Sequence, residues 1–217
     1  MSDPAAADPV TMADLVARAE ALAAHGRRSI LGITGAPGAG KSTVAEQLVQ
    51  ALGPERAVLV PMDGFHLANT VLDALGRRDR KGAADTFDDA GYAALLERIR
   101  AQRPESAETI YAPEFRRELE EPIGSALPVR PAVPLVVTEG NYLLHDAGAW
   151  PRARASLDEV WFIAADEELR RARLIARHER FGKSPEDARA WALGTDERNA
   201  ELIRASAGRA DRVFRLA

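Results

Sequence analysis

The sequence predicts an α/β fold with five strands in a parallel sheet, helices on both faces and a small helical lid. Short apolar runs alternate with amphipathic stretches along most of the chain, which is typical of strands joined by helical crossovers. Polar residues directly follow several apolar runs, as expected where strand ends build a site. The 217 residues, 46% of them apolar, suffice for a substantial core, so we expect a single domain over residues 1–217.

The N-terminal part predicts a helix ahead of the sheet. Thr11, followed by Asp14, is a helix-start pattern, and an apolar stripe continues until Gly26. We interpret residues 1–27 as a helical extension. Residues 1–10 carry no basic-then-apolar signal pattern, and no apolar run approaches the length of a membrane span. We therefore expect a cytoplasmic protein that does not bind membranes.

Composition excludes several classes of function. The chain has no cysteine, so disulfides, thiolate metal sites and a cysteine nucleophile are excluded. Its 29 basic and 33 acidic residues leave a formal net charge of −4, with no overall basic field. We therefore expect no nucleic-acid partner.

The apolar runs and the segments between them give the order of elements. Strands are predicted at residues 29–34, 57–61, 135–138, 160–164 and 211–216, the last at an edge of the sheet. Helices are predicted at residues 41–52, 67–75, 88–101, 185–193 and 196–205, with another that begins at Asp166. Residues 76–82 predict a mobile, exposed charged loop. Residues 104–134 are rich in proline and charge, which is typical of a long irregular loop, and residues 166–195 are interpreted as a lid.

Residues 35–42 read Gly-Ala-Pro-Gly-Ala-Gly-Lys-Ser, a complete phosphate-loop motif between a predicted strand and a predicted helix. The glycines let backbone N–H groups turn inward around phosphate oxygens, and the helix start adds a positive dipole. Lys41 would contact the β- and γ-phosphates of ATP, and the Ser42 hydroxyl would bind Mg²⁺. The alternative is a glycine-rich turn that binds nothing, but all constraints of residue type and context are met together. The predicted nucleotide-binding residues are Gly35, Ala36, Pro37, Gly38, Ala39, Gly40, Lys41, Ser42 and Thr43.

Two carboxylates follow predicted strands. Asp63 comes after the strand at 57–61 and is interpreted as a general base for a substrate hydroxyl, with a helix cap as the alternative. Glu139 ends the strand at 135–138 and is interpreted as holding Mg²⁺ or its water, with a cap or the base as alternatives. An idle carboxylate at an apolar strand end would be costly to bury, which favours functional roles. The sequence does not decide which of the two is the base.

Other candidate residues are cationic. Arg173 and Arg177 lie four residues apart and share a helix face, from which they would clamp the transferring phosphoryl group. Arg170 and Arg171 are interpreted as a solvated charge face. His66 either binds the substrate or donates a structural hydrogen bond, and the sequence favours neither role.

Four motifs recur together in one known family. They are the phosphate loop at 35–42, Pro-Met-Asp-Gly-Phe-His at 61–66, Arg-Lys-Gly at 80–82 with Asp-Thr-Phe-Asp at 85–88, and Glu-Gly-Asn-Tyr-Leu-Leu at 139–144. With them the chain resembles the phosphoribulokinase, uridine kinase and pantothenate kinase superfamily from about Arg28 to its C-terminus. It is most similar to a bacterial branch of nucleoside/nucleotide-kinase-like proteins, some called ATP-dependent fructokinases.

The resemblance implies a three-layer P-loop NTPase fold and roles for individual residues. It implies that Asp63 is the general base, that Glu139 faces magnesium, that residues 173–178 belong to the lid and that Asn199 lies on the adenine side. The residues it implies for the acceptor are His66, Arg80, Lys81, Asp85, Phe87, Tyr111, Arg117 and Asn141. It also favours a homodimer.

Two positions depart from the family pattern. Family members usually have Phe-Asp-Arg where this chain has Phe115-Arg116-Arg117, so an acidic group near the acceptor is missing. Arg198 stands where a proline is usual, which affects the helix start beside Asn199.

These observations predict an ATP- and Mg²⁺-dependent kinase that phosphorylates a hydroxyl of a small metabolite, such as fructose, another sugar or a nucleoside. A GTPase-like switch is an alternative, although no Asn-Lys-x-Asp guanine-recognition run is present. A regulatory nucleotide-binding protein without kinase activity is another, although Lys41, Ser42, Asp63 and Glu139 are all intact. The sequence does not identify the acceptor.

Overall fold

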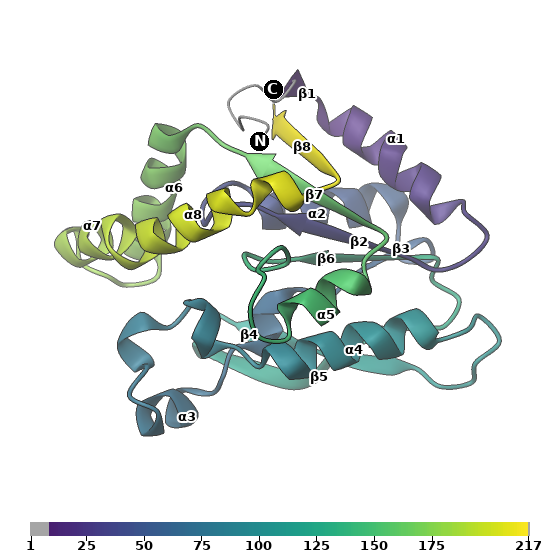
Figure 1. The fold of residues 1–217 in the computed structure, drawn as a ribbon, viewed down its shortest axis with the longest axis horizontal. Helices are drawn as coiled ribbons and strands as arrows, with labels where there is room; N and C mark the ends of the chain where they lie inside the picture. The colour runs from purple at the N-terminus through teal and green to yellow at the C-terminus, as the bar shows by residue number, and fades with distance from the viewer. Residues whose placement is uncertain (1–8, 217) are drawn as a thin grey trace.

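The computed structural model describes residues 9–216 and contains a six-stranded parallel sheet, ordered β1-β8-β7-β2-β6-β3 (Figure 1). Its strands are β1 (Pro9–Val10), β2 (Ser29–Thr34), β3 (Ala57–Leu59), β6 (Leu135–Glu139), β7 (Glu159–Ala164) and β8 (Arg212–Leu216). The predicted parallel sheet is confirmed, with one strand more than expected. The extra strand is the two-residue β1, which pairs with β8, so β8 is not an edge strand. Interpretations that rest on residues 1–8 lie outside the described part.

The predicted helices are present in the predicted order, and α5 is one helix more than expected. The helices are α1 (Met12–Ala23), α2 (Lys41–Leu52), α3 (Asn69–Ala74), α4 (Asp89–Ala101), α5 (Trp150–Ala155), α6 (Glu167–Arg180), α7 (Pro185–Leu193) and α8 (Thr195–Ala205). The predicted start of α1 forms a capping box: Thr11 Oγ1 accepts from the Asp14 N–H at 3.2 Å, and Asp14 Oδ2 accepts from the Thr11 N–H at 2.9 Å. Within residues 9–27 the N-terminal extension therefore contains the predicted helix, which strand β1 precedes.

Apolar side chains on the two faces of the sheet form two cores. Leu31 and Ile33 pack with α1 and α2 on one face, while Ile30 packs with α4 and α5 on the other. All six residues of β2 are buried, because helices cover both of its faces. This burial on both faces explains why the strands appear in the sequence as continuous apolar runs.

The segment predicted as a long irregular loop is a β-hairpin, so that prediction is wrong. β4 (Ile110–Arg116) and β5 (Glu121–Val129) pair antiparallel as a separate two-stranded sheet, with a register shift between Ala112 and Glu114. Proline lacks an N–H and is confined to bulges and to the unpaired side of a strand. A two-stranded ribbon gives each strand such a side, and Pro113 falls at the register shift.

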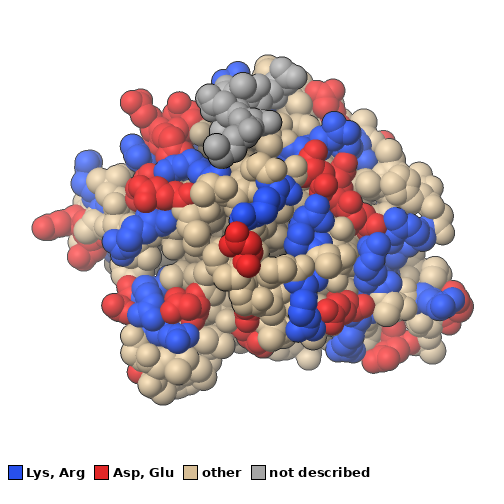
Figure 2. All heavy atoms as spheres, in the orientation of Figure 1, with Lys and Arg blue, Asp and Glu red and all other residues tan. Residues whose placement is uncertain are grey.

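Helices α6, α7 and α8 form a lobe at the left of Figure 1, beside the sheet and above the segment that contains α3. This lobe includes the residues predicted as a lid, and we call it the lid lobe. On the face shown in Figure 2, acidic and basic side chains are interspersed. Among residues 9–216, no helix combines the length and the apolar character that crossing a membrane requires.

Candidate active site

The phosphate loop connects β2 to α2 and packs against the lid lobe. Gly38 has a φ of +83°, a left-handed conformation that favours glycine, and a Cβ there would lie 2.8 Å from the Arg170 carbonyl oxygen. The Lys41 Nζ donates to the carbonyl oxygen of Ala36, in the same loop, at 3.2 Å. Burial lowers the pKa of Lys41 to about 8. Thr43 is exposed on α2 behind the loop.

Ser42 and Glu139 meet beside the phosphate loop. The Ser42 hydroxyl donates to Glu139 Oε1 at 3.1 Å, and Glu139 is only 6% exposed. Sheet order explains the meeting, since β6, which ends in Glu139, lies next to β2, which leads into the loop. A hydroxyl and a buried carboxylate are hard oxygen ligands that suit Mg²⁺, which in nucleotide sites is bound by few protein groups together with phosphates and water. Residues 9–216 contain no group of three or more His, Cys, Asp or Glu arranged to hold a metal.

Asp63 lies just past β3, the neighbour of β6, in the short 3₁₀ helix η2 (Met62–Phe65). The β4–β5 hairpin crosses directly over this turn: a Cβ on Gly64 would lie 2.4 Å from the Pro113 carbonyl oxygen, so only glycine fits. This close approach brings Arg117 to Asp63, with Arg117 Nη2 3.3 Å from Asp63 Oδ2. The hairpin therefore forms one wall of the site.

The two carboxylates have opposite pKa shifts. Burial, and then the nearby charge of Asp63, raise the pKa of Glu139 to about 7. Burial also acts to raise the pKa of Asp63, but His66, Arg117 and Lys41 together hold it below its usual value. Asp63 is therefore ionised at neutral pH and able to accept a proton.

His66 is fixed by its surroundings. Its Nδ1 lies 2.8 Å from the Asp63 carbonyl oxygen, which can only accept, so Nδ1 carries the proton. Its ring lies between Phe87 and Phe115, with centroid distances of 4.0 and 4.7 Å. Burial lowers the pKa of His66, which keeps the ring neutral. His66 thus has the structural hydrogen bond considered from the sequence, and it also lines the cavity.

A cavity of about 320 Å³ joins these groups. Lys41, Ser42, Asp63, Glu139 and Arg117 all line it. The other predicted residues that line it are Pro37, Lys81, Phe87, Asn141, Arg177 and Asn199. Asn199 is buried and its Nδ2 donates to the Gly82 carbonyl oxygen at 3.4 Å, so the lid lobe and the 76–82 loop meet across the cavity.

Of the predicted nucleotide-binding residues, Gly35, Ala36, Gly38, Ala39, Gly40 and Thr43 do not line this cavity, and four other predicted residues do not line it either. Arg80 and Asp85 pair with each other at 2.8 Å, and Tyr111 is 56% exposed on β4. We therefore leave these three out of the proposed site. Arg173 is exposed on α6, and its Nη1 would lie 3.9 Å from a Cβ on Gly40, so it lies close to the phosphate loop.

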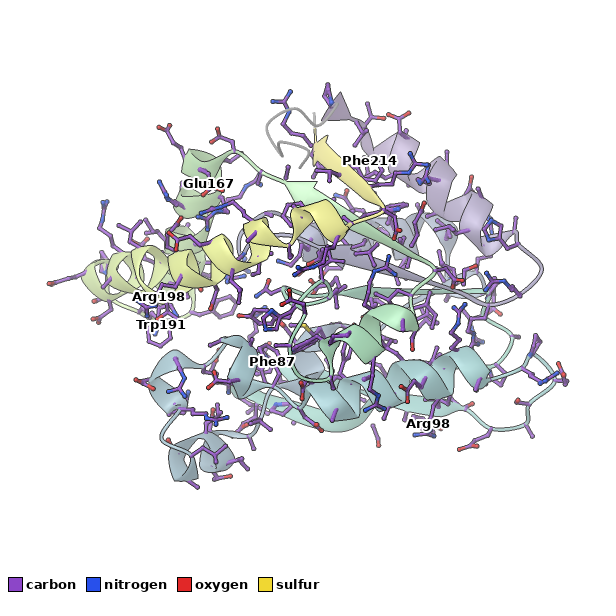
Figure 3. The ribbon with its side chains drawn as sticks, in the orientation of Figure 1. Phe87, Arg98, Glu167, Trp191, Arg198 and Phe214 are labelled. Atoms are coloured by element: carbon purple, nitrogen blue, oxygen red, sulfur yellow. The ribbon has the colours of Figure 1, made fainter. Side chains whose placement is uncertain are left out.

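Several cavity residues were not selected from the sequence. They are Arg78, Gly82, Phe115, Glu120, His178, Phe181, Lys183, Trp191 and Asp196. In Figure 3, Trp191 lies at the lower edge of the lid lobe and Phe87 in the segment below it. Asp196 accepts from His178 at 2.7 Å. Only Phe115 had a signal in the sequence, because it stands in the segment where family members usually have Phe-Asp-Arg. The positions of the other residues depend on the tertiary structure.

The interpretation of Arg170 as solvated is wrong. Its side chain is fully buried and binds Glu167 at 2.8 Å, Glu197 at 2.5 Å and the Pro37 carbonyl oxygen at 3.2 Å. Leu174, four residues later on the same face of α6, is also buried, and this spacing was a usable signal. At the departure Arg198, α8 still begins at Thr195, and the Arg198 guanidinium is exposed and donates to the Thr195 hydroxyl.

A phosphate loop at the end of β2, carboxylates after the two neighbouring strands and a helical lid define a P-loop kinase. The sequence model of the "Phosphoribulokinase / Uridine kinase family" matches residues 30–214, and the chain belongs to this family. Membership confirms the resemblance inferred from the motifs, and the family's members use ATP.

Two relatives and one solved structure illustrate the similarity. The chain is 35% identical over 148 residues to the ATP-dependent kinase-like protein notR' of Aspergillus versicolor, covering 65% of this chain and 86% of the relative. It is 36% identical over 195 residues to the uncharacterized protein YggC of Escherichia coli (strain K12), covering 88% and 78%. A structure described as a "putative fructose transport system kinase" from Silicibacter sp. TM1040 has a TM-score of 0.79 and 33% identity, covering 94% of this chain and 98% of that one.

Proposed function

We propose that the protein uses ATP and Mg²⁺ to phosphorylate a hydroxyl group of a small polar metabolite. The observation that carries this proposal is the position of Asp63. Its ionised carboxylate lines the same cavity as Lys41 of the phosphate loop, and Arg117 and Arg177 line it too. A base and phosphate-binding cations that share one cavity are the parts that phosphoryl transfer to a hydroxyl requires.

In the proposed reaction, the acceptor oxygen forms a bond to the γ-phosphorus while the bond from that phosphorus to the β–γ bridging oxygen breaks. Asp63 takes the proton of the acceptor hydroxyl, and ADP leaves with the electron pair of the broken bond. Lys41 and Arg177 would stabilise the negative charge that develops on the moving group. Asn199 is proposed to contact the nucleotide from the lid side.

Ser42 and Glu139 are proposed to hold Mg²⁺. Their contact at 3.1 Å brings a hydroxyl and a carboxylate together beside the phosphate loop. Bound there with ATP, the ion would neutralise part of the phosphate charge. Asp63 remains available as the base, because its ion-pair partner is Arg117, whereas Ser42 and Glu139 contact each other.

The direct test is acceptor-dependent ADP release by purified protein, with ATP and Mg²⁺, across sugars, sugar phosphates, nucleosides and hydroxy acids. We expect one class of acceptor to stimulate release and EDTA to abolish it. Lys41→Ala should eliminate turnover, because this ammonium is proposed to stabilise the phosphates directly.

Gln47→Ala is the matched control, since Gln47 is exposed on the same helix and lies outside the phosphate loop. It should keep most of the wild-type turnover. ATP binding without a response to any acceptor would contradict the proposed kinase activity, and turnover that persists in EDTA would contradict the role of Mg²⁺.

A further inference from the structure

The cavity is lined by a group of cations that come from the 76–82 loop and the β4–β5 hairpin. Arg78, Lys81 and Arg117 line the part that we call the acceptor pocket, together with His66 and Phe115. The Lys81 ammonium lies 5.1 Å, and the Arg117 guanidinium 5.9 Å, from the centroid of the Phe115 ring. Burial lowers the pKa of His66, and the nearby positive charges of Lys81 and Arg117 lower it further.

Lys81 is held in place by neutral partners. Its Nζ donates to the Asn69 side-chain oxygen at 2.6 Å and to the Glu120 carbonyl oxygen at 2.5 Å. These two bonds connect α3, the 76–82 loop and the hairpin turn, and they use two of its three N–H groups. Within residues 9–216 no carboxylate pairs with Lys81. Its positive charge is therefore oriented but not neutralised.

The nearest carboxylates are engaged or exposed. Glu121 accepts from the Asn69 backbone N–H at 3.0 and 3.1 Å. Glu120 also lines the cavity, but its side chain is exposed and forms no ion pair with Arg78 or Lys81. Burial lowers the pKa of Lys81 and Arg78 lowers it further, while Glu121 and Glu120 act in the opposite direction. Arg78 also lines the cavity, and the described residues supply it with no ion pair. The repulsion between Arg78 and Lys81 is unfavourable, and a bound anion would offset it.

Arginines elsewhere in the protein differ. Arg100 and Arg27 both pair with Asp158, at 2.7 and 2.8 Å, and Arg152 pairs with Glu97 at 3.0 Å. Within the 76–82 loop, Arg80 pairs with Asp85 and lies outside the cavity. Two cations that face one pocket without carboxylate partners therefore indicate an anionic ligand.

We propose that the acceptor is a small hydroxyl compound with a carboxylate or phosphate group, and that Lys81 and Arg78 bind this anionic group. This inference rests on the proposed function, because Asp63 must receive the hydroxyl at the other end of the pocket. The carbon skeleton lies against Phe115, whose ring is bordered by Lys81 and by Arg117, the partner of Asp63. A neutral sugar or a nucleoside leaves both cations without a partner.

The test compares acceptors that differ only in the anionic group. Glycerol, glycerate and glycerol 3-phosphate form a three-carbon series, and fructose with fructose 6-phosphate forms a six-carbon pair. We expect kcat/KM to be about 10-fold to 100-fold higher for an anionic member than for its neutral partner, since charge-assisted hydrogen bonds contribute that much. The three-carbon series separates carboxylate from phosphate. A neutral member that equals or exceeds its anionic partners would overturn the inference.

Variants locate the effect. Lys81→Gln should raise KM for the anionic acceptor by about 10-fold or more, while leaving kcat, the KM for ATP and the weak activity with the neutral partner close to wild type. Arg78→Gln should do the same to a smaller degree. Arg80→Gln is the matched control, because it removes a neighbouring charge outside the cavity and should change none of these values. Equal losses with anionic and neutral acceptors would mean that Lys81 acts only on the structure, which contradicts the inference.

A binding measurement separates this inference from the proposed function. If no acceptor is phosphorylated, the proposed function fails, and inorganic phosphate is titrated into the protein with saturating ADP, which occupies the phosphate loop. Binding that is lost in Lys81→Gln and kept in Arg80→Gln would support the anion site. Binding that is absent, or equal in the two variants, would overturn it.

Discussion

Helix α6 carries two pairs of arginines, Arg170 with Arg171 near its start and Arg173 with Arg177 further along, and the two pairs have different surroundings. The first pair contacts carboxylates: Arg170 binds Glu167 and Glu197, and Arg171 binds Glu197 at 3.2 Å. Among residues 9–216, no carboxylate lies within salt-bridge distance of Arg173 or Arg177. Arg177 instead lines the cavity, and Arg173 lies near Gly40.

The difference shows that residue type and helix spacing do not decide the role of an arginine. Glu197, which comes from α8, neutralises Arg170 and Arg171 and leaves Arg173 and Arg177 without a carboxylate partner among residues 9–216. A neutralised arginine connects parts of the fold, and Arg170 joins α6 and α8 to the phosphate loop through the Pro37 carbonyl oxygen. An arginine without a carboxylate is available to a phosphate.

Arg170→Met tests the arginines of α6 that pair with carboxylates, and it should have the largest effect. It removes the buried partner of Glu167 and Glu197, although both keep Arg204 and Glu197 also keeps Arg171. The loss of several charge-assisted hydrogen bonds should cost about 2–3 kcal/mol. Urea unfolding should show this loss of stability. ATP affinity should fall as well, since the phosphate loop loses a donor to Pro37. An unchanged unfolding midpoint would contradict the structural role of Arg170.

Arg177→Gln tests the arginines of α6 that have no carboxylate partner among residues 9–216. We expect kcat to fall about 10² to 10³-fold, as when one donor to a developing charge is removed. Stability should stay the same or rise, because burial and repulsion from Arg117 already disfavour the charge of Arg177 and lower its pKa. Steady-state kinetics and urea unfolding of the same preparation give both values. A stability loss like that of Arg170→Met would contradict the distinction between the two pairs of arginines.

Low pH should weaken the ion pairs that Arg170 and Arg171 form with Glu197. Hydrogen bonds from Arg171, and then from Arg170 and Arg204, lower the pKa of Glu197 from 4.5 to about 2. A lowered carboxyl pKa stabilises the folded state above pH 4.5, and this contribution is lost as the pH falls from 4.5 towards 2. The unfolding free energy of Glu197→Gln should therefore depend less on pH than that of the wild type in this window. Parallel curves for the two proteins would contradict the assignment.

Arg171→Gln should have the smallest effect. Its guanidinium is exposed, and ion pairs at the surface contribute little. Because Arg171 also binds Glu197, urea unfolding should show a loss of at most about 1 kcal/mol, and kcat should match the wild type. This variant is therefore the control for Arg170→Met and Arg177→Gln. A marked change in either value would show that exposure does not separate the arginines of α6.

Much of the fold could be predicted from the sequence, because buried parallel strands and helix caps leave local signals. The hairpin at residues 110–129 could not, since its prolines suggest irregular structure until the pairing of the two strands is known. Pro113 is tolerated at the register shift, a feature that depends on a partner strand distant in sequence.

The site was partly predictable for a similar reason. Lys41, Ser42, Asp63 and Glu139 are placed by strand ends, and the structure brings them together as expected. Arg78 and Arg80 lie two residues apart in one short 3₁₀ helix, and spacing alone does not tell which of them faces the cavity. In the structure Arg80 pairs with Asp85 and lies outside the cavity, whereas Arg78 lines it, and the Arg80–Asp85 contact depends on tertiary structure.

The most direct test of the account is the kinetics of Asp63→Asn beside Glu139→Gln, with the best acceptor and varied Mg²⁺. The account predicts that Asp63→Asn lowers kcat about 10² to 10⁴-fold with an unchanged KM for ATP and an unchanged Mg²⁺ requirement. Glu139→Gln should instead raise the Mg²⁺ concentration needed for half-maximal rate. Normal turnover by Asp63→Asn, or a raised Mg²⁺ requirement in that variant alone, would contradict the assignment of Asp63 as the base.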